Sequence, residues 1–237
     1  MSNPLIEKYN EIHQNKFNHI ELDLPTIERV VIDGVRYYDL KDKNKKLVSI
    51  TSVISHYKKD FFAQWRKRVG EEKANQITRQ ATSRGTDTHT LIEHYLLNED
   101  LPSVQPLSEH LFQIAKPTLS RINNIHCLES SLYSEVLGIA GTVDTIAEFD
   151  GELAIIDYKT SKEPKPVEWI EGYFVQCAAY AAMLYEMTGL KVKKFVIIMT
   201  CENGECVVYE ERDKKKYLQL LQKYIEKFLN DKLELTE

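Results

Sequence analysis

One predicted β-hairpin constrains the fold of this chain most, because both of its strands carry charged side chains where they approach one edge of a sheet. Apolar residues alternate from Ile139 to Phe149, and Asp150-Gly151 is a strong two-residue turn signal. The continuous apolar run from Leu153 to Ile156 is typical of a buried strand. With the turn centred on Asp150-Gly151, antiparallel pairing places Asp144 roughly opposite Asp157, with side chains about 5 Å apart.

The alternation of side chains along a strand places Asp157 and Lys159 on one face and Tyr158 on the other. Two carboxylates and an ammonium group at one end of a sheet suit metal-assisted cleavage of a phosphodiester, since Mg²⁺ and Mn²⁺ prefer oxygen ligands and can acidify a water. Asp-x-Lys alone also fits a surface hairpin with solvated charges. The buried run before Asp157 argues against that alternative, because charges at the end of a buried strand need partners.

Further polar residues stand in an ordered series around this hairpin. A predicted helix carries Gly85, His89 and Glu93, and a second helix, Val167 to Met187, carries Gln176 and Tyr180 one turn apart before Gly189 ends it. Apolar or aromatic residues at near-helical spacing support this second helix: Trp169, Tyr173, Cys177, Tyr180 and Leu184.

The series His89, Asp144, Asp157-x-Lys159, Gln176-x-x-x-Tyr180 resembles the nuclease core of the PD-(D/E)XK superfamily. Within that superfamily it is most similar to RecB-like exonucleases of the mitochondrial genome maintenance exonuclease type, with their bacterial and phage relatives. The likeness covers roughly residues 60 to 230.

The resemblance implies roles for individual residues. Asp144, Asp157, the carbonyl of Tyr158 and His89 would bind Mg²⁺ or Mn²⁺, and Lys159 would act with Asp144 and Asp157 in catalysis. Gln176 and Tyr180 would brace the site or touch the substrate backbone; Tyr180 also fits a core position and Gln176 an interior amide. Supporting roles fall to three acids that rank below the central trio, since each also fits a solvated position: Glu93, Glu129 and Glu135.

Charge is unevenly distributed along the chain. The formal net charge is −5, yet residues 58 to 84 hold eight basic residues against three acids, while residues 85 to 155 hold eleven acids against two bases. A basic segment beside an acidic one suits a nuclease, because cations hold the phosphate backbone and acids hold metal. A solvated amphipathic helix would explain the lysines equally well. Phe61, Phe62 and Trp65 interleave with the bases and fit either core positions or stacking platforms for unpaired bases.

From these features we predict a set of substrate-binding residues: Gln176, Tyr180, Arg84, Trp65, Arg66, Arg68 and Thr160.

The composition fits one compact enzyme with a sizeable core, at 237 residues and 43% hydrophobic content. The four cysteines are scattered through apolar stretches, which indicates reduced, buried thiols and does not match the clustered cysteines of iron-sulfur nucleases. We expect no membrane span and no signal or transit peptide, and Glu7 and Glu11 argue against a mitochondrial leader. A cytoplasmic location in a bacterium or phage-infected cell follows as the expectation.

The predicted architecture is α/β: a PD-(D/E)XK (restriction endonuclease-like) core with a central mixed sheet flanked by helices. We expect a single nuclease domain over 1–237, with an N-terminal hairpin extension in 1–57, a helical region in 58–125 and the catalytic core in 126–237. Further predicted elements are a hairpin across Asp33-Gly34, a strand Leu47 to Ile54, a helix from near Ser55 to beyond Trp65, a helix near Leu107 to Asn123, a hairpin across Asn203-Gly204 and a helix Asp213 to Leu229.

The predicted activity is that of a metal-dependent DNA exonuclease that prefers single strands and works in replication, recombination or repair; proteins of those processes are the expected partners. A structure-specific or restriction-like endonuclease on duplex DNA remains open, as does a catalytically silent DNA-binding subunit. The run His89 to His94 is not a zinc-protease motif, because histidines five apart lie on different faces of a helix. Phosphate-cradling glycine loops and Gly-x-Ser-x-Gly elbows are absent from the sequence.

Overall fold

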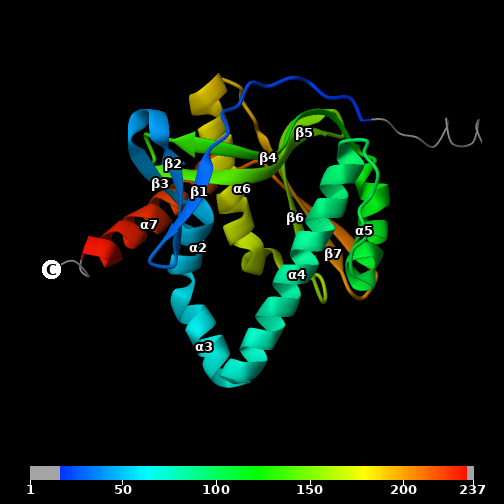
Figure 1. Cartoon of the computed structure of the whole chain (residues 1–237), viewed down its shortest axis with the longest axis horizontal. Helices are drawn as coiled ribbons and strands as arrows, with labels where there is room; N and C mark the ends of the chain where they lie inside the picture. The colour runs from blue at the N-terminus through cyan, green and yellow to red at the C-terminus, as the bar shows by residue number, and fades with distance from the viewer. Residues whose placement is uncertain (1–16, 234–237) are drawn as a thin grey trace, which may run out of the picture.

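The computed structural model describes residues 17–233 as one mixed sheet flanked by helices (Figure 1). The strands are β1 (Glu28–Ile32), β2 (Val35–Leu40), β3 (Lys45–Ser49), β4 (Ile122–Ser134), β5 (Ile139–Phe149), β6 (Glu152–Ser161), β7 (Lys194–Cys201) and β8 (Cys206–Glu211). The helices are a short 3-10 turn (Lys41–Lys43), α2 (Ile50–Tyr57), α3 (Lys59–Val69), α4 (Glu71–Leu96), α5 (Pro106–Leu119), α6 (Val167–Thr188) and α7 (Lys214–Leu233). Glu7 and Glu11 lie outside the described residues.

The sheet runs in the order β1-β2-β3-β5-β6-β7-β8, with β4 paired to β5 off this path. The pairs β3 with β5 and β6 with β7 are parallel, and the other pairs are antiparallel, so the predicted mixed sheet is confirmed. Strands β5 and β6 form the predicted hairpin across Asp150-Gly151, where both residues have positive φ as a tight two-residue turn requires.

One edge of strand β5 pairs with β4 along its whole length. The other edge is divided between two strands: β3 pairs with Ile139 and Ala140, and β6 pairs with Thr145 to Phe149. Residues 141–144 lie between these two pairings, at the point where β3 and β6 part. The sheet therefore opens beside Asp144.

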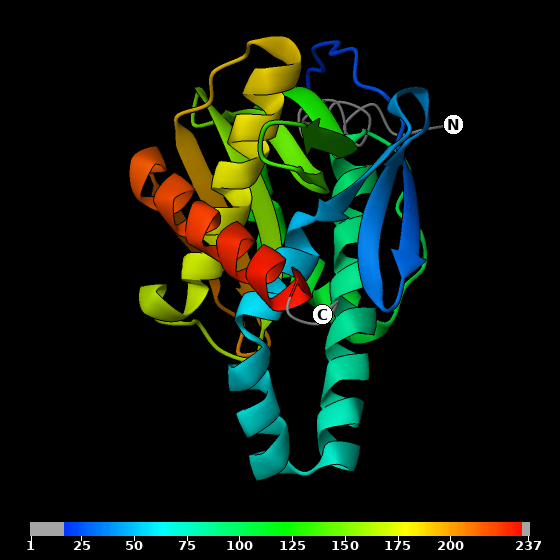
Figure 2. The ribbon, with the colours of Figure 1, turned by 90° about the vertical axis from the view of Figure 1, so that its left-hand side faces the viewer.

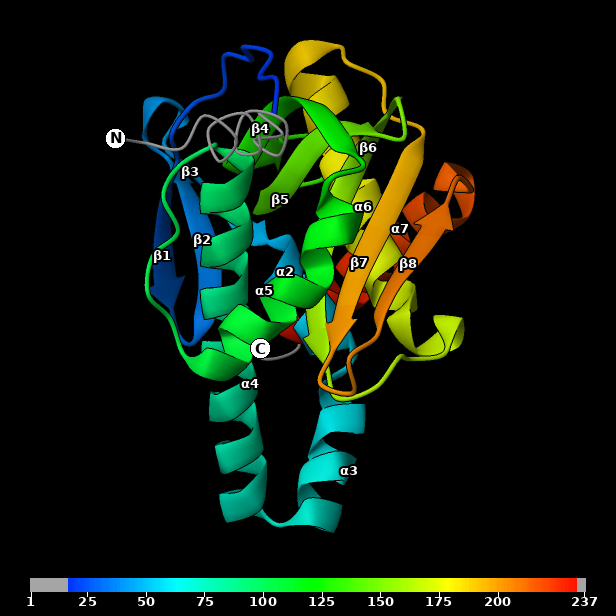
Figure 3. The ribbon, with the colours of Figure 1, turned by 90° about the vertical axis from the view of Figure 1, so that its right-hand side faces the viewer.

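Helices cover both faces of the sheet, as Figures 2 and 3 show from opposite sides. On one face, α2, α6 and α7 enclose the larger core with β5, β6 and β7, and α6 is buried almost throughout its middle turns. On the other face, α4 and α5 pack their apolar residues onto the same strands, with side chains such as Leu91 and Phe112 fully buried. Strand β6, buried on both faces, reads as a continuous apolar run for this reason.

Two predicted elements differ from the structure. The strand predicted for Leu47 to Ile54 ends at Ser49, and α2 begins at Ile50, because Ile50 and Val53 then point into the core from one helical face. The single helix predicted beyond Ser55 is divided at Lys58 into α2 and α3. In the first turn of α6, Trp169 is 71% exposed and does not join the apolar face assigned to it.

Helix α3, Gly70 and the first half of α4 form a helical arm that projects away from the body in both Figure 2 and Figure 3; we call residues 59–81 the arm. Gly70 joins the two helices with a φ of +89°, a conformation that L side chains rarely adopt. Helix α3 buries none of its residues, and Phe61 and Phe62 are exposed. The side chains of α3 are therefore not packed into the core of the protein.

Two sequence expectations about the whole chain can be compared with the described residues. None of their helices is both long enough and apolar enough to cross a membrane. The four cysteines carry free thiols, of which Cys177 and Cys201 are buried, while Cys127 and Cys206 are only half-buried.

Candidate metal centre and active site

Asp144 and Asp157 are the next residues beyond the last paired positions of β5 and β6, Thr145 and Ile156. The ladder between the two strands does not continue there. Instead the backbone N–H of Tyr158 donates to Asp144 Oδ2 at 2.9 Å, so a side-chain carboxylate replaces the backbone acceptor. The opening of the sheet thus fixes the Asp144 carboxylate directly.

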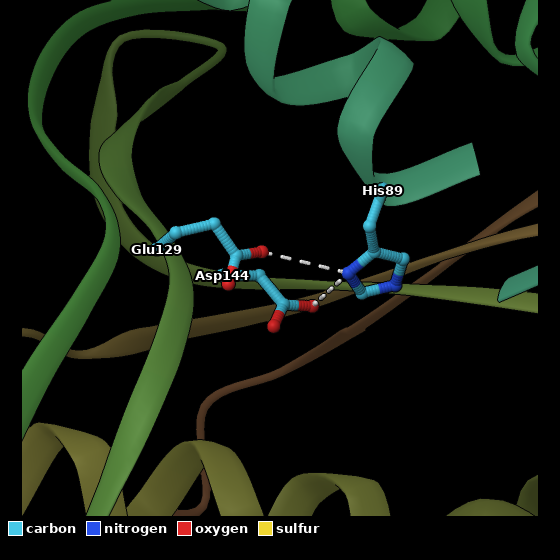
Figure 4. Close-up of side chains that lie close together, drawn as sticks. All are labelled: His89, Glu129 and Asp144. Atoms are coloured by element: carbon cyan, nitrogen blue, oxygen red, sulfur yellow. Dashed lines mark ion pairs between the residues drawn. The ribbon is translucent and has the colours of Figure 1, made fainter. Parts of the chain in front are cut away.

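Helix α4 brings His89 to the same place. Its Nε2–H donates to the carbonyl oxygen of Tyr158 at 2.9 Å, which leaves Nδ1 facing two carboxylates. Nδ1 lies 3.6 Å from Glu129 Oε1 and 3.7 Å from Asp144 Oδ2 (Figure 4). One helix and two strands therefore converge on a single group of potential ligands, His89, Glu129 and Asp144, whose ligand atoms all lie within 4.8 Å of one another.

Glu129 joins the group because of the register between β4 and β5. Leu128 pairs with Thr145 and Ser130 with Val143, so Glu129 falls opposite Asp144. Its φ of +42° lies in the left-handed region, which is strained for a residue with a side chain and costs on the order of 1 to 3 kcal/mol. Backbone strain at a residue whose carboxylate faces another carboxylate is typical of a functional site.

Burial acts to lower the pKa of His89, but the charges of Asp144 and Glu129 outweigh it and raise the pKa to about 9. Without a bound cation, the imidazole carries a proton at neutral pH and itself compensates the two carboxylates. A metal ion at Nδ1 would take over that role.

Asp157 is almost completely buried, at 1% exposure. Its carboxylate forms an ion pair with the Lys159 ammonium, yet neither oxygen accepts a hydrogen bond of normal geometry among the described residues. Burial raises the pKa of Asp157, against the opposing charge of Lys159. An orphaned buried carboxylate of this kind is costly unless a cation or further donor completes it.

The Lys159 ammonium lies between the two carboxylates and an aromatic ring. Besides its ion pair with Asp157, it donates to the carbonyl oxygen of Tyr158 at 3.3 Å and lies 4.9 Å above the ring centroid of Tyr173. Burial lowers the pKa of Lys159, but Asp157 and Asp144 outweigh it and raise the pKa above its usual range. Lys159 therefore remains a cation and is suited to hold negative charge rather than to accept a proton.

The Tyr158 side chain lies on the opposite face of β6 from Asp157 and Lys159, as the alternation predicts, and its ring meets the His89 ring edge to face at 5.9 Å. It joins the core under α4, and its hydroxyl is hydrogen bonded to the Thr145 hydroxyl at 2.9 Å. Its carbonyl oxygen, expected to be a metal ligand, already accepts hydrogen bonds from His89 and Lys159.

Arg84 and Thr160 lie together at the end of β6. The Arg84 guanidinium pairs with Glu202 and donates to Thr160 Oγ1 at 3.4 Å, which ties α4 to the sheet. Because this guanidinium is only 14% exposed and already paired, it holds the His89 helix in position.

Gln176 and Tyr180 contact each other and not the metal group. Gln176 Nε2 donates to the Tyr180 hydroxyl at 3.0 Å, and Tyr180 is 1% exposed. The Tyr180 ring lies so close to Gly141 that a Cβ there would approach Tyr180 Cε1 to 2.7 Å. Tyr180 therefore braces β5 just before Asp144.

Four other predicted residues are not brought to the group. Glu135 lies in the turn between β4 and β5 and pairs with Lys43 and Lys45, roughly 17 Å along the strand from Asp144. On the arm, Trp65 is half-buried, Arg68 is exposed and Arg66 pairs with Glu71 at 2.8 Å.

Glu93, one turn after His89, lies near Glu129. Burial and the charge of Glu129 both raise the pKa of Glu93.

Sequence reasoning placed Glu129 below the central trio and assigned Tyr173 only to the apolar face of its helix. The signal for Glu129 was available: a four-residue turn at 135–138 centres the β4–β5 hairpin so that Glu129 and Asp144 are opposite. Its left-handed backbone could not be foreseen. Tyr173 carries no sequence signal that separates it from a core tyrosine, because its position under Lys159 depends on how α6 packs.

The donor set fits a divalent cation. Ligand distances of about 2.0 to 2.2 Å would place the ligands of one ion about 3 to 4.4 Å apart, close to the spacing of His89, Glu129 and Asp144. The orphaned Asp157 oxygens add carboxylate capacity next to them. Carboxylates suit Mg²⁺ and Mn²⁺, and the imidazole favours the softer of the two.

Comparison with known proteins agrees with this chemistry. The model of the PD-(D/E)XK nuclease superfamily matches residues 118–237, just over half of the chain. Human mitochondrial genome maintenance exonuclease 1 is 25% identical over 195 residues, which are 73% of this chain and 56% of that protein. Its mouse counterpart is 29% identical over 115 residues, 45% of this chain and 33% of that protein. The chain thus spans about half or less of the length of these curated relatives.

A solved structure of a candidate exonuclease from Eubacterium rectale is also similar. It covers 65% of this chain and 66% of its own, with a TM-score of 0.49 and 15% sequence identity. The family match includes Glu129, Asp144, Asp157 and Lys159 but begins after His89.

Proposed function

Because the chain belongs to the PD-(D/E)XK nuclease superfamily, we propose that it is a divalent-metal-dependent exonuclease that acts on single-stranded DNA. The observation that carries the proposal is the convergence of His89, Glu129 and Asp144 beside the buried pair of Asp157 and Lys159. The exonuclease names of the human and mouse relatives support the choice of an exonuclease over an endonuclease.

Asp144, Glu129 and His89 Nδ1 would hold the cation, with the Asp157 carboxylate, which also pairs with Lys159, completing its ligands. When bound, Mg²⁺ or Mn²⁺ neutralises the scissile phosphate and lowers the pKa of a water. His89 is held in the ligand orientation by its bond to the Tyr158 carbonyl, which fixes the proton on Nε2 and leaves Nδ1 free to coordinate.

Lys159 supplies the fixed positive charge of the site. Its ammonium is held by Asp157 and by the Tyr158 carbonyl, so it is already oriented before substrate arrives. A cation oriented in advance stabilises the negative charge that develops on the phosphate and orients hydroxide for in-line attack.

The arm supports a preference for single strands. Phe61 is 65% exposed and Phe62 46% exposed, and the two rings meet edge to face at 5.6 Å among exposed basic residues such as Lys67 and Arg68. Exposed aromatic rings stack on unpaired bases, while neighbouring lysines and arginines contact the backbone. A role in replication, recombination or end processing in the cytoplasm, alongside proteins of those processes, is part of the same proposal.

A time course on end-labelled single strands in Mg²⁺ and in Mn²⁺ tests the proposal. Linear strands with free ends should be shortened stepwise, strands with both ends blocked and circular strands should survive, and EDTA should stop the reaction. Cleavage of circular or duplex DNA would indicate an endonuclease. A purified chain without EDTA-sensitive cleavage would instead be a silent binding subunit.

A further inference from the structure

Lys58, at the junction of α2 and α3, lies directly against α6. A Cβ at Gly172 would stand 2.8 Å from Lys58 Nζ and 3.1 Å from its Cε, so the glycine leaves room for the end of this side chain in its present position. The side chain is half-buried, and its ammonium is therefore held in place between two helices.

A second lysine reaches the same region from the loop before α6. Lys165 Nζ donates to the Tyr173 hydroxyl at 3.5 Å and lies 5.9 Å from the centroid of the Tyr173 ring. The same ring lies 4.9 Å from Lys159 Nζ. Tyr173 thus contacts both the lysine of the candidate active site and Lys165, and the charge of Lys165 in turn acts on Lys58.

Carboxylates compensate Lys58 and Lys165 only weakly. Within residues 17–233, neither of these two lysines has an ion pair, unlike the half-buried Arg84, Lys159 and Lys227. Burial lowers the pKa of Lys58, and the charge of Lys165 lowers it further. Glu171 opposes this effect, but it lies 3.9 Å from Lys216 on α7 and shares its charge with it. Two half-buried ammonium groups that repel each other indicate a missing anion.

The start of α6 adds to the positive potential. The helix begins at Val167, two residues after Lys165, and no side-chain hydrogen bond caps its first turn, which also carries Glu168; the N–H of Trp169 donates to the Pro166 carbonyl. Free backbone N–H groups at a helix start favour anions.

We propose that Lys58 and Lys165 bind the backbone phosphate next to the scissile phosphate of a single-stranded nucleic acid whose cleavage site lies at Lys159. The inference rests on the proposed nuclease function and adds a substrate subsite to it. Tyr173 sets the spacing between the two phosphate positions, and Gly172 lets Lys58 reach the outer one.

Binding without cleavage tests the subsite first. Fluorescence anisotropy with a labelled oligothymidylate in EDTA should show roughly tenfold weaker binding for Lys58→Gln and for Lys165→Gln, the usual effect of losing a charged hydrogen bond. Each variant should also reduce the slope of log Kd against log salt by about 0.7, the value for one phosphate contact on a single strand. Lys215→Gln, which removes an exposed lysine of α7, is the matched control and should bind as the wild type does.

The variant Gly172→Ala tests whether the position of the Lys58 ammonium matters when its charge is kept. The added methyl group meets only the flexible end of Lys58 and, at 3.6 Å, Ile54, so the helix should remain folded while the ammonium is displaced. The variant keeps every charge, yet binding should weaken as in Lys58→Gln. Melting curves for all variants check that the fold is intact.

Cleavage of strands with one neutral methylphosphonate locates the subsite. Neutralising the phosphate beside the cleavage position should slow the wild type about tenfold but have no further effect on the Lys58→Gln, Lys165→Gln double variant. If the wild type cleaves single strands and the variants bind with unchanged affinity and salt slope, the subsite is overturned and the nuclease assignment stands. A wild type that neither binds nor cleaves single strands would overturn both.

Discussion

The sheet centre and the arm hold their side chains in opposite ways. At the sheet centre, Asp157 is buried at 1% exposure between cores on both faces of the sheet, and both of its carboxylate oxygens are shielded from solvent. On the arm, α3 buries nothing and presents Phe61 and Phe62 to solvent. If the proposed function holds, the difference is a division of work: fixed geometry serves the chemical step, and a lightly packed surface serves contact with the nucleic acid.

The largest effect should appear at the sheet centre. Lys159→Ala and Asp157→Ala each remove a charge that is oriented before substrate binds, so the rate of nucleotide release from end-labelled single strands should fall by a factor on the order of a thousand. Lys215→Ala on α7 serves as the control with an unchanged rate. If Lys159→Ala or Asp157→Ala still cleaved DNA, the sheet centre would not be the site of the chemical step.

Metal binding at the sheet centre should depend strongly on pH. His89 must lose its proton to coordinate, and its pKa of about 9 keeps it protonated at pH 7. Affinity for Mg²⁺ should therefore rise about tenfold per pH unit from pH 7 and level off above about pH 9, as calorimetry can measure. His89→Gln should bind more weakly and lose this dependence. A wild type with pH-independent affinity would show that His89 is not a ligand.

Replacing one glycine at the sheet centre and one beside the arm by alanine compares how tightly the two regions are packed. Gly141→Ala would force a Cβ to 2.7 Å from Tyr180 and 2.8 Å from Ile50, so the free energy of unfolding should fall by about 1 to 3 kcal/mol in urea titrations. Gly172→Ala meets mainly the end of Lys58 and should leave stability unchanged or raise it by up to about 1 kcal/mol. Equal losses at both positions would contradict the difference in packing.

The smallest effects on folding should come from the arm. Phe61→Ala and Phe62→Ala should weaken binding to single strands about tenfold each, because a stacked base is lost. The free energy of unfolding should change by less than about 0.5 kcal/mol, since both rings are exposed. A large loss of stability, or unchanged binding, would show that the rings belong to the fold and not to the substrate surface.

Local turn chemistry made the centre of the fold predictable from the sequence. Asp150-Gly151 fixes the register that brings Asp144 next to Asp157, and the alternation beyond it separates Lys159 from Tyr158. These contacts depend on residues close in the chain. The N-terminal hairpin across Asp33-Gly34 was predictable for the same reason.

Features that depend on packing between distant segments were not predictable. The run Val48 to Ile54 is rich in β-branched residues and reads as a strand, but burial of Ile50 and Val53 against α6 favours a helix. The sequence is equally consistent with Tyr180 as a core residue or as a substrate contact, and only the structure shows that its ring packs against Gly141. Glu135 and Glu129 look alike in sequence, and only the position of the hairpin turn decides that one pairs with lysines and the other faces Asp144.

The shared edge of β5 has a consequence for motion. Residues 141–144 have neither β3 nor β6 beside them, so on this edge of β5 their backbone groups lack the strand pairing that the residues before and after them have. Amide exchange there should proceed through local opening, while the amides of β6 facing β7 should wait for global unfolding. A cation bound by Asp144, His89 and Glu129 would link β5 to α4 and β4 at this segment and slow its amide exchange more than that of other segments. The ion would then stabilise the sheet as well as take part in the reaction.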